Sequence, residues 1–351
     1  MAPSNGSDVR IMRAERDING AWSHLVSELS ESTLAHASEW LAAIRHTYGH
    51  EPLYLMAEDG AGRVGVLPAF VVRRPFFGTV VASMPFLDTG GPCASSTGLA
   101  HALVERLMVE ARGIDATVVE LRCTQRLSLP TPPMEHKVTL TLLLPSDPDC
   151  LWRQLDGSVR NQIRKAERSG LTVECGGADK LDDFYGIFAT RMRELGSPVH
   201  GRPFFGAIVD AFGSRARVAV VRKGTTPIGG LIALAFKDIL AVPWASCLRE
   251  YFTMCPNMLL YWETLRHGCG EGFRHFNFGR STRGSGTYRF KRQWGAREQP
   301  LFWYAIPVHG SRTRMVPPRG SSAAVLTGSW RHLPLAVTRY LGPRIRRYLT
   351  Q

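Results

Sequence analysis

The segment FNFGRSTRGSGTYRFKRQWGA, Phe276 to Ala296, gathers residue types that suit an anionic or acylated ligand. Its glycines make the backbone pliable, its arginines and lysine carry positive charge, and its Tyr, Phe and Trp residues supply rings. A loop of this composition can fold around an anion. Its Gly-Ser-Gly does not open a long helix after a strand, so we reject a Walker or Rossmann nucleotide site.

A second polar group lies just upstream, in the stretch VPWASCLREYFTMCPN. We expect a strand to end near Trp244 and to open a cleft, where Ser246, Arg249 and Asn257 offer hydrogen bonds. Asn257 suits another position equally well, the N-cap of the helix that follows. The two interpretations remain open.

The run LWRQLDGSVRNQIRKAERSG predicts one helix from Leu151 to about Gly170, with an apolar side and a cationic side. Guanidinium groups give bidentate contacts to phosphate. We therefore predict phosphate binding by Arg160, Arg164 and Lys165, for a nucleotide, a coenzyme or a tRNA. The alternative is a solvated helix face, which is common.

Metal and redox chemistry find little support in the sequence. The seven cysteines lie far apart without a Cys-x-x-Cys pair, and the eleven histidines form no closely spaced pair of ligands. We predict no metal site and reduced thiols. The N-terminus lacks the pattern of a secretory signal, and the most apolar stretch, from Gly229 to Leu248, is interrupted by Lys237 and Asp238. We expect a cytoplasmic protein.

The net charge of +13 favours polyanionic partners, and much of the excess lies near the C-terminus. No acidic residue follows Glu298, and the last part, LPLAVTRYLGPRIRRYL, predicts a basic amphipathic segment. Two outcomes are open. The segment docks peripherally on an anionic membrane, or it packs on its own domain with a solvated cationic face.

An internal repeat organises the chain. One constant offset superimposes Phe204 on Trp40, Phe212 on Tyr48 and Gly224 on Gly60. In both copies a helix ends at a glycine and is followed by an apolar strand, a polar turn and a second apolar strand. Such self-similarity indicates a duplicated unit.

The length of 351 residues also favours two domains. A proline-rich crossing, LSLPTPPMEHKV, separates the copies because proline resists helix and central-strand structure. We predict a first domain over residues 1–150, a second over 151–309, and a basic linker with an amphipathic tail over 310–351.

These motifs resemble the FemAB family, in particular the FemAB-related proteins associated with exosortase/PEP-CTERM and exopolysaccharide loci. The resemblance lies in FLDTGGP, VRNQIRKAERSGL, VPWASCLREY, CPNMLLYWE and FGRSTRGSGTYRFKRQWGA. It implies an α/β (α+β) fold of two tandem GNAT-like domains, each a mixed central sheet flanked by helices. This agrees with the repeat.

The resemblance also implies an N-acyltransferase. An amine of a cell-envelope or exopolysaccharide-related acceptor would attack the donor directly, because no cysteine or serine lies in a recognisable nucleophile setting. The donor is acyl-CoA, as in looser relatives, or aminoacyl-tRNA, as in Fem ligases that act on peptidoglycan precursors. A third alternative is a non-catalytic protein that binds a glycan precursor or a membrane surface.

Site residues follow from the same resemblance. Phe290 and Lys291 match the Phe-Lys pair of Fem ligases, and the Lys291 ammonium is suited to stabilise the oxyanion. Asp88 in FLDTGGP is the candidate base, with Glu263 behind it, although Asp88 is equally well placed as a turn residue. The predicted substrate-binding residues are Trp244, Ser246, Arg249, Asn257, Tyr261, Arg280, Ser281, Thr287, Tyr288 and Phe290.

Overall fold

The computed structural model describes residues 9–14, 18–75, 77–309 and 321–350. The chain divides into two compact units, each assembled from separate stretches of sequence. The first unit holds residues 1–135, 300–315 and 348–351, and the second holds residues 136–299 and 316–347.

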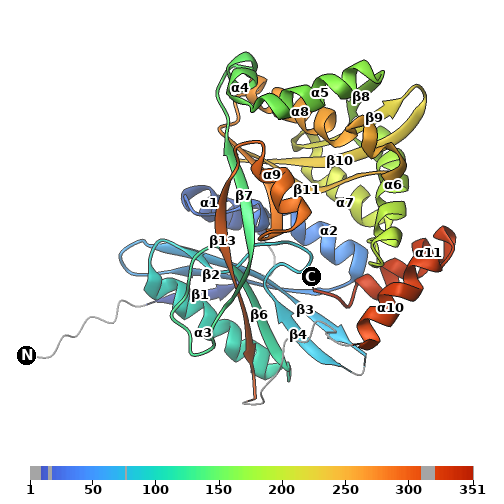
Figure 1. Ribbon diagram of the computed structural model, residues 1–351. Coiled ribbons are helices and arrows are strands. Elements are labelled where there is room, and N and C mark those ends of the chain that lie inside the picture. Colours follow the sequence, from blue (N-terminus) through green and yellow to red (C-terminus); the bar gives the residue numbers. More distant parts are fainter. Residues whose placement is uncertain (1–8, 15–17, 76, 310–320, 351) are drawn as a thin grey trace, which may run out of the picture. The chain divides into compact units, whose positions relative to one another are not determined.

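The first unit is a mixed sheet with the strand order β1-β2-β3-β4-β6-β13, and β5 pairs at one end of β3 (Figure 1). Strands β4 and β6 run parallel, and α3 connects them. The elements are β1 (Arg10–Arg13), α1 (Ser23–Glu28), α2 (Glu39–Tyr48), β2 (Glu51–Glu58), β3 (Val64–Arg74), β4 (Gly78–Ala82), β5 (Cys93–Ala94), α3 (Thr97–Gly113), β6 (Val118–Cys123) and most of β13 (Arg297–Pro307).

Side chains that alternate along β2 divide the core of this unit between the two faces of the sheet. Leu53 and Leu55 pack in the cluster that α3 covers. Tyr54 points to the other face, where its ring lies 4.6 Å from that of Trp22. Both rings are buried, so each face of the sheet has its own apolar layer.

A buried arginine fixes the loop that follows β4. The Arg122 guanidinium donates to the carbonyls of Met84 (3.1 Å), Leu87 (2.5 Å) and Thr350, and lies 5.2 Å from the Trp303 ring. Arg122 also pairs with the Glu120 carboxylate. The Thr350 hydroxyl donates to the same carboxylate at 2.6 Å. The C-terminal residues of the chain are thereby anchored in the first unit.

We predict that Arg122→Met lowers the free energy of unfolding by about 3–5 kcal/mol, because it leaves a buried carboxylate and several carbonyls without their donor. Urea denaturation followed by circular dichroism measures this loss. Arg126→Met is the matched control: Arg126 forms an exposed pair with Glu135, and such pairs contribute about 1 kcal/mol or less. Equal effects of the two substitutions would contradict the anchoring role.

The second unit is also a mixed sheet, with the order β7-β12-β11-β10-β9-β8. Here β11 and β12 run parallel, and α8 connects them. The elements are β7 (Met134–Leu143), α4 (Pro148–Gln154), α5 (Gly157–Arg168), β8 (Leu171–Gly176), α6 (Leu181–Glu194), α7 (Arg202–Phe212), β9 (Ala216–Lys223), β10 (Thr226–Phe236), β11 (Ile239–Cys247), α8 (Pro256–Gly270), β12 (His275–Thr282), α9 (Gly286–Arg292), α10 (Ser321–His332) and α11 (Leu335–Arg346).

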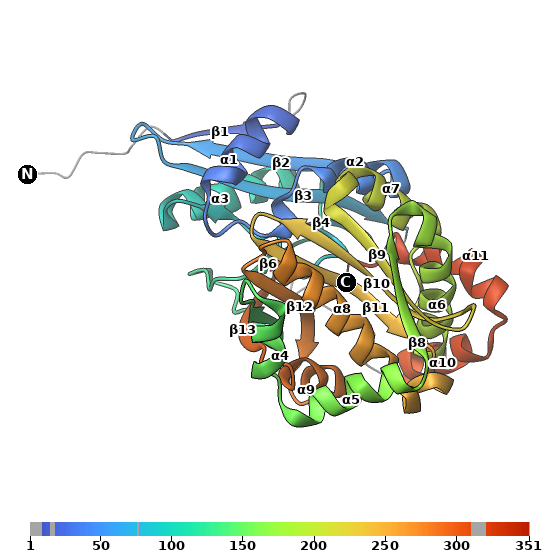
Figure 2. The same cartoon turned by 90° about the horizontal axis from the view of Figure 1, so that it is seen from above.

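Helices cover both faces of this sheet (Figure 2). On one face, α8 and α5 share a core with Phe276 and Phe278 of β12. On the other face, α6 and α7 contribute a cluster of phenylalanines, in which Phe184 and Phe205 meet edge to face at 5.3 Å. Edge-to-face rings at this distance attract each other beyond the gain from burial.

The predicted repeat is present in the elements. In the first unit α2 ends at Gly49 and leads into β2 and β3, and in the second α7 ends at Gly213 and leads into β9 and β10. Gly49 and Gly213 both have positive φ values, 68° and 54°, which favour glycine. The fold is α/β with two mixed sheets, as expected.

The unit boundary differs from the predicted cut at residue 150, since residues 136–150 belong to the second unit. The reason is that β7 hydrogen-bonds along β12 from Lys137 to Leu143. The predicted linker over residues 310–320 lies outside the described residues. The predicted tail forms two helices, of which α11 packs on α6. None of the described helices is long and apolar enough to cross a membrane.

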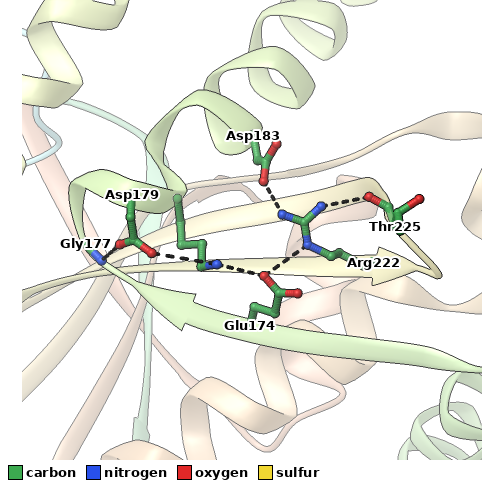
Figure 3. A network of polar contacts seen from close by, with 7 residues as sticks. Glu174, Gly177, Asp179, Asp183, Arg222 and Thr225 are labelled. Carbon is green, nitrogen blue, oxygen red and sulfur yellow. Dashed lines mark hydrogen bonds and ion pairs between the residues drawn. The ribbon is translucent and has the colours of Figure 1, made fainter.

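A polar network ties α6 to the β8–β9 edge (Figure 3). The Arg222 guanidinium contacts Glu174 at 3.1 Å, and it pairs with Asp183 on α6. Lys180 donates to the same Glu174 carboxylate at 2.8 Å. The hydrogen bonds from Lys180 and Arg222 lower the pKa of Glu174, so the folded chain favours its charged form.

This shift sets the sign of a pH effect. Because the pKa of Glu174 is lower in the folded chain than in the unfolded chain, its stabilising contribution is present at neutral pH and is lost as the pH falls through the folded pKa. Glu174→Gln should therefore narrow the difference in melting temperature between neutral and acidic buffer, in thermal melts across that range. Glu167→Gln, an exposed change on α5, serves as the control. If Glu174→Gln leaves the pH dependence of the melting temperature unchanged, the linkage is contradicted.

Candidate functional site

The parallel strands β11 and β12 separate in the middle of the second unit. Their shared register covers Ile239–Ala241 against His275–Asn277. Beyond it, β11 continues to Cys247 beside β10, and β12 continues to Thr282 beside β7. Pairing between the two strands therefore ends after Ala241 and Asn277, and the unpaired interval between them is called here the β11–β12 opening.

Both strands carry a β-bulge where they diverge. Ala241 and Trp244 of β11 pair with two residues of β10 that are closer together in sequence by one position. The extra residue of β11 places the bulge at Val242 and Pro243. The same mismatch on β12 places a bulge between Asn277 and Arg280. A bulge removes backbone groups from the ladder and redirects them, and bulges are frequent beside active sites.

The bulge in β12 depends on Gly279 and Lys291. Gly279 has φ 74°, a conformation that glycine adopts without steric cost. The Lys291 ammonium is buried, and it donates to the carbonyls of Gly279 (3.0 Å) and Arg280 (2.8 Å). Lys291 thus supplies donors for carbonyls that the bulge turns away from the ladder. Its action at an oxyanion stays a prediction.

An aromatic wall flanks the opening on the α8 side. Tyr261 of α8 stacks on Phe278 at 5.5 Å and meets Phe290 of α9 at 5.1 Å. Burial raises the pKa of the Tyr261 phenol, so this hydroxyl stays protonated at neutral pH. The neighbouring Trp294 is buried, and its indole N–H has no hydrogen-bond partner among the described residues.

Trp244 and Ser246 of β11, both predicted to bind substrate, lie in different environments. Trp244 is buried, because its ring packs edge-on against Phe204 and Phe205 of α7 at 5.9 and 5.2 Å. It therefore belongs to the core on the α6–α7 face. Ser246 is half-buried and pairs with Gly230 of β10.

Other predicted residues lie at the end of β12 and at the start of α9. Ser281 donates to Thr287 at 3.4 Å, and Tyr288 donates to Glu298 at 2.7 Å. This bond is the main cause of the raised pKa of the Tyr288 phenol. Arg280 is half-buried at the end of the β12 bulge. The turn is thus a connected polar structure bordering the opening.

Two further predicted residues lie in the 3-10 turn before α8 and in the first turn of α8. Arg249 is exposed at the start of a short 3-10 turn, Arg249–Met254. Asn257 is not the N-cap of α8, because Cys255 takes that position with a left-handed φ of 59° and Pro256 begins the helix. Asn257 is the half-buried second helical residue. Glu263, on the same helix, pairs with Arg266.

The predicted phosphate-binding helix is broken into α4 and α5. Asp156 interrupts it, because its carboxylate accepts from the Ser158 amide at 2.7 Å and caps α5. Arg160 donates to the carbonyls of Leu155 (2.7 Å) and Arg153 (3.1 Å) and so caps α4, which is a structural use of the guanidinium. Arg164 and Lys165 are exposed, and Arg164 lies over the Trp152 ring at 5.4 Å.

Asp88 belongs to the first unit, in the loop that Arg122 fixes. Its carbonyl accepts from the Trp303 indole at 3.1 Å, and its side chain is half-buried. Lys291 belongs to the second unit. The catalytic pair predicted from the sequence is therefore divided between the units, and its joint action stays a prediction.

The structure adds a polar cavity of about 270 Å³ in the first unit, which the sequence analysis missed. It lies between the loop before α3 and the end of β6. The available signal was the run GGPCASST, whose Ser96 caps α3 by accepting from the Leu99 amide at 3.3 Å. Its polar lining residues include His36, Ser95, Thr97, Thr124, Gln125 and Arg126.

Residues 153–292 match the family model described as an acetyltransferase (GNAT) domain. These residues lie within the second unit and include the β11–β12 opening. No curated protein sequence matches the chain. Among the described residues, no cluster of three His, Cys, Asp or Glu side chains is arranged to hold a metal ion.

Solved structures show the fold of most of the chain. The crystal structure of FemX matches with a TM-score of 0.62 at 13% identity, over 85% of this chain and 97% of that one. A tandem GNAT protein from the clavulanic acid biosynthesis pathway matches with a TM-score of 0.53 at 11% identity, over 87% and 100%. The C-terminal domain of a putative lysylphosphatidylglycerol synthetase from Agrobacterium fabrum matches with 0.54 at 14% identity, over 87% and 93%. The fold is tandem GNAT-like.

We predict that Lys291→Met lowers the free energy of unfolding by about 2–4 kcal/mol, since two carbonyls lose a buried charged donor. Hydrogen exchange should quicken at the amides of β12. Lys223→Met, on an exposed lysine at the end of β9, is the control that should leave both quantities unchanged. Unaltered protection of β12 in Lys291→Met would show that the ammonium does not hold the bulge.

Proposed function

We propose that this chain is an N-acyltransferase that transfers an acyl group from a thioester donor, acyl-CoA, to an amine. The acyl end of the donor is held in the β11–β12 opening of the second unit. One observation carries the proposal: both strands bordering the opening bulge where their mutual pairing ends, so backbone groups leave the ladder there.

The donor suits the residues around the opening. The arm of coenzyme A is an extended chain with amide groups, and such a chain can pair with strand edges as an added strand does. Phe290 is half-buried and offers apolar surface for it, and the buried Tyr261 and Phe278 lie behind this ring. The indole N–H of Trp294, which has no partner in the described part of the chain, is a buried donor of the kind that a ligand carbonyl satisfies.

The chemistry is a direct attack. The amine nitrogen bonds to the thioester carbonyl carbon, an oxyanion forms, and the carbon–sulfur bond breaks to leave an amide and a thiolate. Backbone N–H groups near a bulge can stabilise the oxyanion. The base that takes the amine proton is predicted to be Asp88. Tyr261, protonated at neutral pH, is proposed to return a proton to the thiolate.

The acceptor is proposed to be an amine of a cell-envelope or exopolysaccharide-related precursor. The net charge of +13 suits an anionic acceptor. The fold shared with FemX and with a putative lysylphosphatidylglycerol synthetase is compatible with this class. The polar cavity of the first unit is proposed to bind a polar part of one substrate.

Aminoacyl-tRNA is the second candidate donor. The exposed cations Arg164, Lys165 and Arg168 on α5 favour it, because they form a charged helix face that can follow a phosphate backbone. Transfer from an aminoacyl-tRNA mixture that stops after ribonuclease treatment would select this donor over acyl-CoA.

We predict that Tyr261→Phe lowers kcat by about 100-fold and changes KM little, because the ring is kept and the phenolic proton is lost. Release of thiol from acyl-CoA in the presence of amines measures turnover. Tyr185→Phe, on α6, is the matched control with full activity expected. Equal turnover of Tyr261→Phe and wild type would remove Tyr261 from the reaction, and absence of thiol release with any acyl-CoA would overturn the donor.

A further inference from the structure

Helix α11 packs on the second unit through its smallest residues. Thr338 and Gly342 are the buried positions of the helix. A Cβ atom at Gly342 would lie 3.0–3.1 Å from the backbone and side chain of Val199, so glycine allows this close approach. Arg339 extends over the Tyr185 ring at 5.4 Å, and Arg346 donates to His200 at 2.9 Å. The inward face is therefore small and polar.

Large apolar side chains on the rest of the helix, some of them beside this packed face, are exposed to solvent. Tyr340, Leu341 and Ile345 are 62%, 36% and 39% exposed. Tyr340 and the exposed Arg344 lie one turn apart on the side away from Thr338, and the Arg344 guanidinium lies over the Tyr340 ring at 3.6 Å. Leu341 and Ile345 lie one turn apart beside the packed face. An ordinary surface helix turns its apolar stripe toward the core. Here more than a third of the surface of each of Tyr340, Leu341 and Ile345 remains uncovered.

We call the residues Tyr340, Leu341, Arg344, Ile345 and Arg347 the α11 outer face. Its charge is of one sign, because no acidic residue follows Glu298 in the sequence. A second copy of the same face would bring arginine against arginine, which repels. A nucleic acid would pair with the arginines and leave Leu341 and Ile345 in water. An anionic lipid surface accepts both, with headgroups for arginine and acyl chains for the apolar residues.

We propose that the α11 outer face docks this protein on membranes that contain anionic phospholipids. The helix lies in the interface plane with Leu341 and Ile345 toward the acyl chains. Arg344 and Arg347 remain at the level of the headgroups, as long cationic side chains do. The proposal stands on α11 alone and does not require the acyltransferase activity.

The test is flotation of the full chain with vesicles. The protein should float with vesicles of equal amounts of phosphatidylcholine and phosphatidylglycerol, and should stay at the bottom with phosphatidylcholine alone. The double variant Leu341→Gln/Ile345→Gln should lower the bound fraction about tenfold, because two apolar anchors are lost. Val109→Gln, another exposed apolar position on α3, is the matched control.

Each outcome decides the proposal. Circular dichroism melts that match wild type show that the double variant is folded, as expected for exposed positions. Binding to anionic vesicles that the double variant retains, or no binding by wild type, overturns the proposal. A concentration-dependent dimer that the double variant abolishes, without vesicle binding, would assign the face to a second copy instead. Arg344→Gln/Arg347→Gln should weaken binding and reduce its sensitivity to salt.

Discussion

The structure of the second unit depends on hydrogen-bond donors for the buried carbonyl groups of the β12 bulge. Divergence of two parallel strands opens a sheet, but it also takes peptide groups out of the ladder, and buried unpaired carbonyls are costly. In this fold a single ammonium, Lys291, reaches back from α9 to two such carbonyls on β12. The lysine, the left-handed Gly279 and the short α9 that carries the lysine therefore act together to hold the β12 bulge.

The two units use one strand-and-helix order and differ at the connection after the third strand of the repeat. In the first unit that connection is the loop fixed by Arg122, with a polar cavity beside the start of α3. In the second it is a 3-10 turn that ends at Cys255, and the neighbouring strands bulge instead. Duplication kept the sheet that supports a site, and the side chains at this one connection made the two copies different.

Local patterns predicted much of the fold and little of the site. The paired helices, their terminal Gly49 and Gly213 and the strands that follow were predicted, because each depends on neighbours in sequence. The break at Asp156 was missed, since an apolar stripe continues across it and only the cap ends the helix. The bulges were also missed, because a bulge is defined by a partner strand that is distant in sequence. The packing of Trp244 against α7 and the hydrogen bonds of Lys291 to β12 were also missed, since composition does not tell which way a side chain points.

The end of the chain shows why a point substitution is more informative than a truncation. Helix α11 belongs to the second unit, whereas Tyr348–Gln351 belongs to the first. Thr350 accepts from the buried Arg122, and its hydroxyl donates to Glu120. Removing the tail would therefore remove a partner from a buried charge pair, with a cost in stability unrelated to membranes. Helix α11 packs on α6, and Thr350, a few residues after the helix, is hydrogen-bonded to buried side chains. Leu341 and Ile345 are therefore exposed on an ordered helix and not on a frayed terminus.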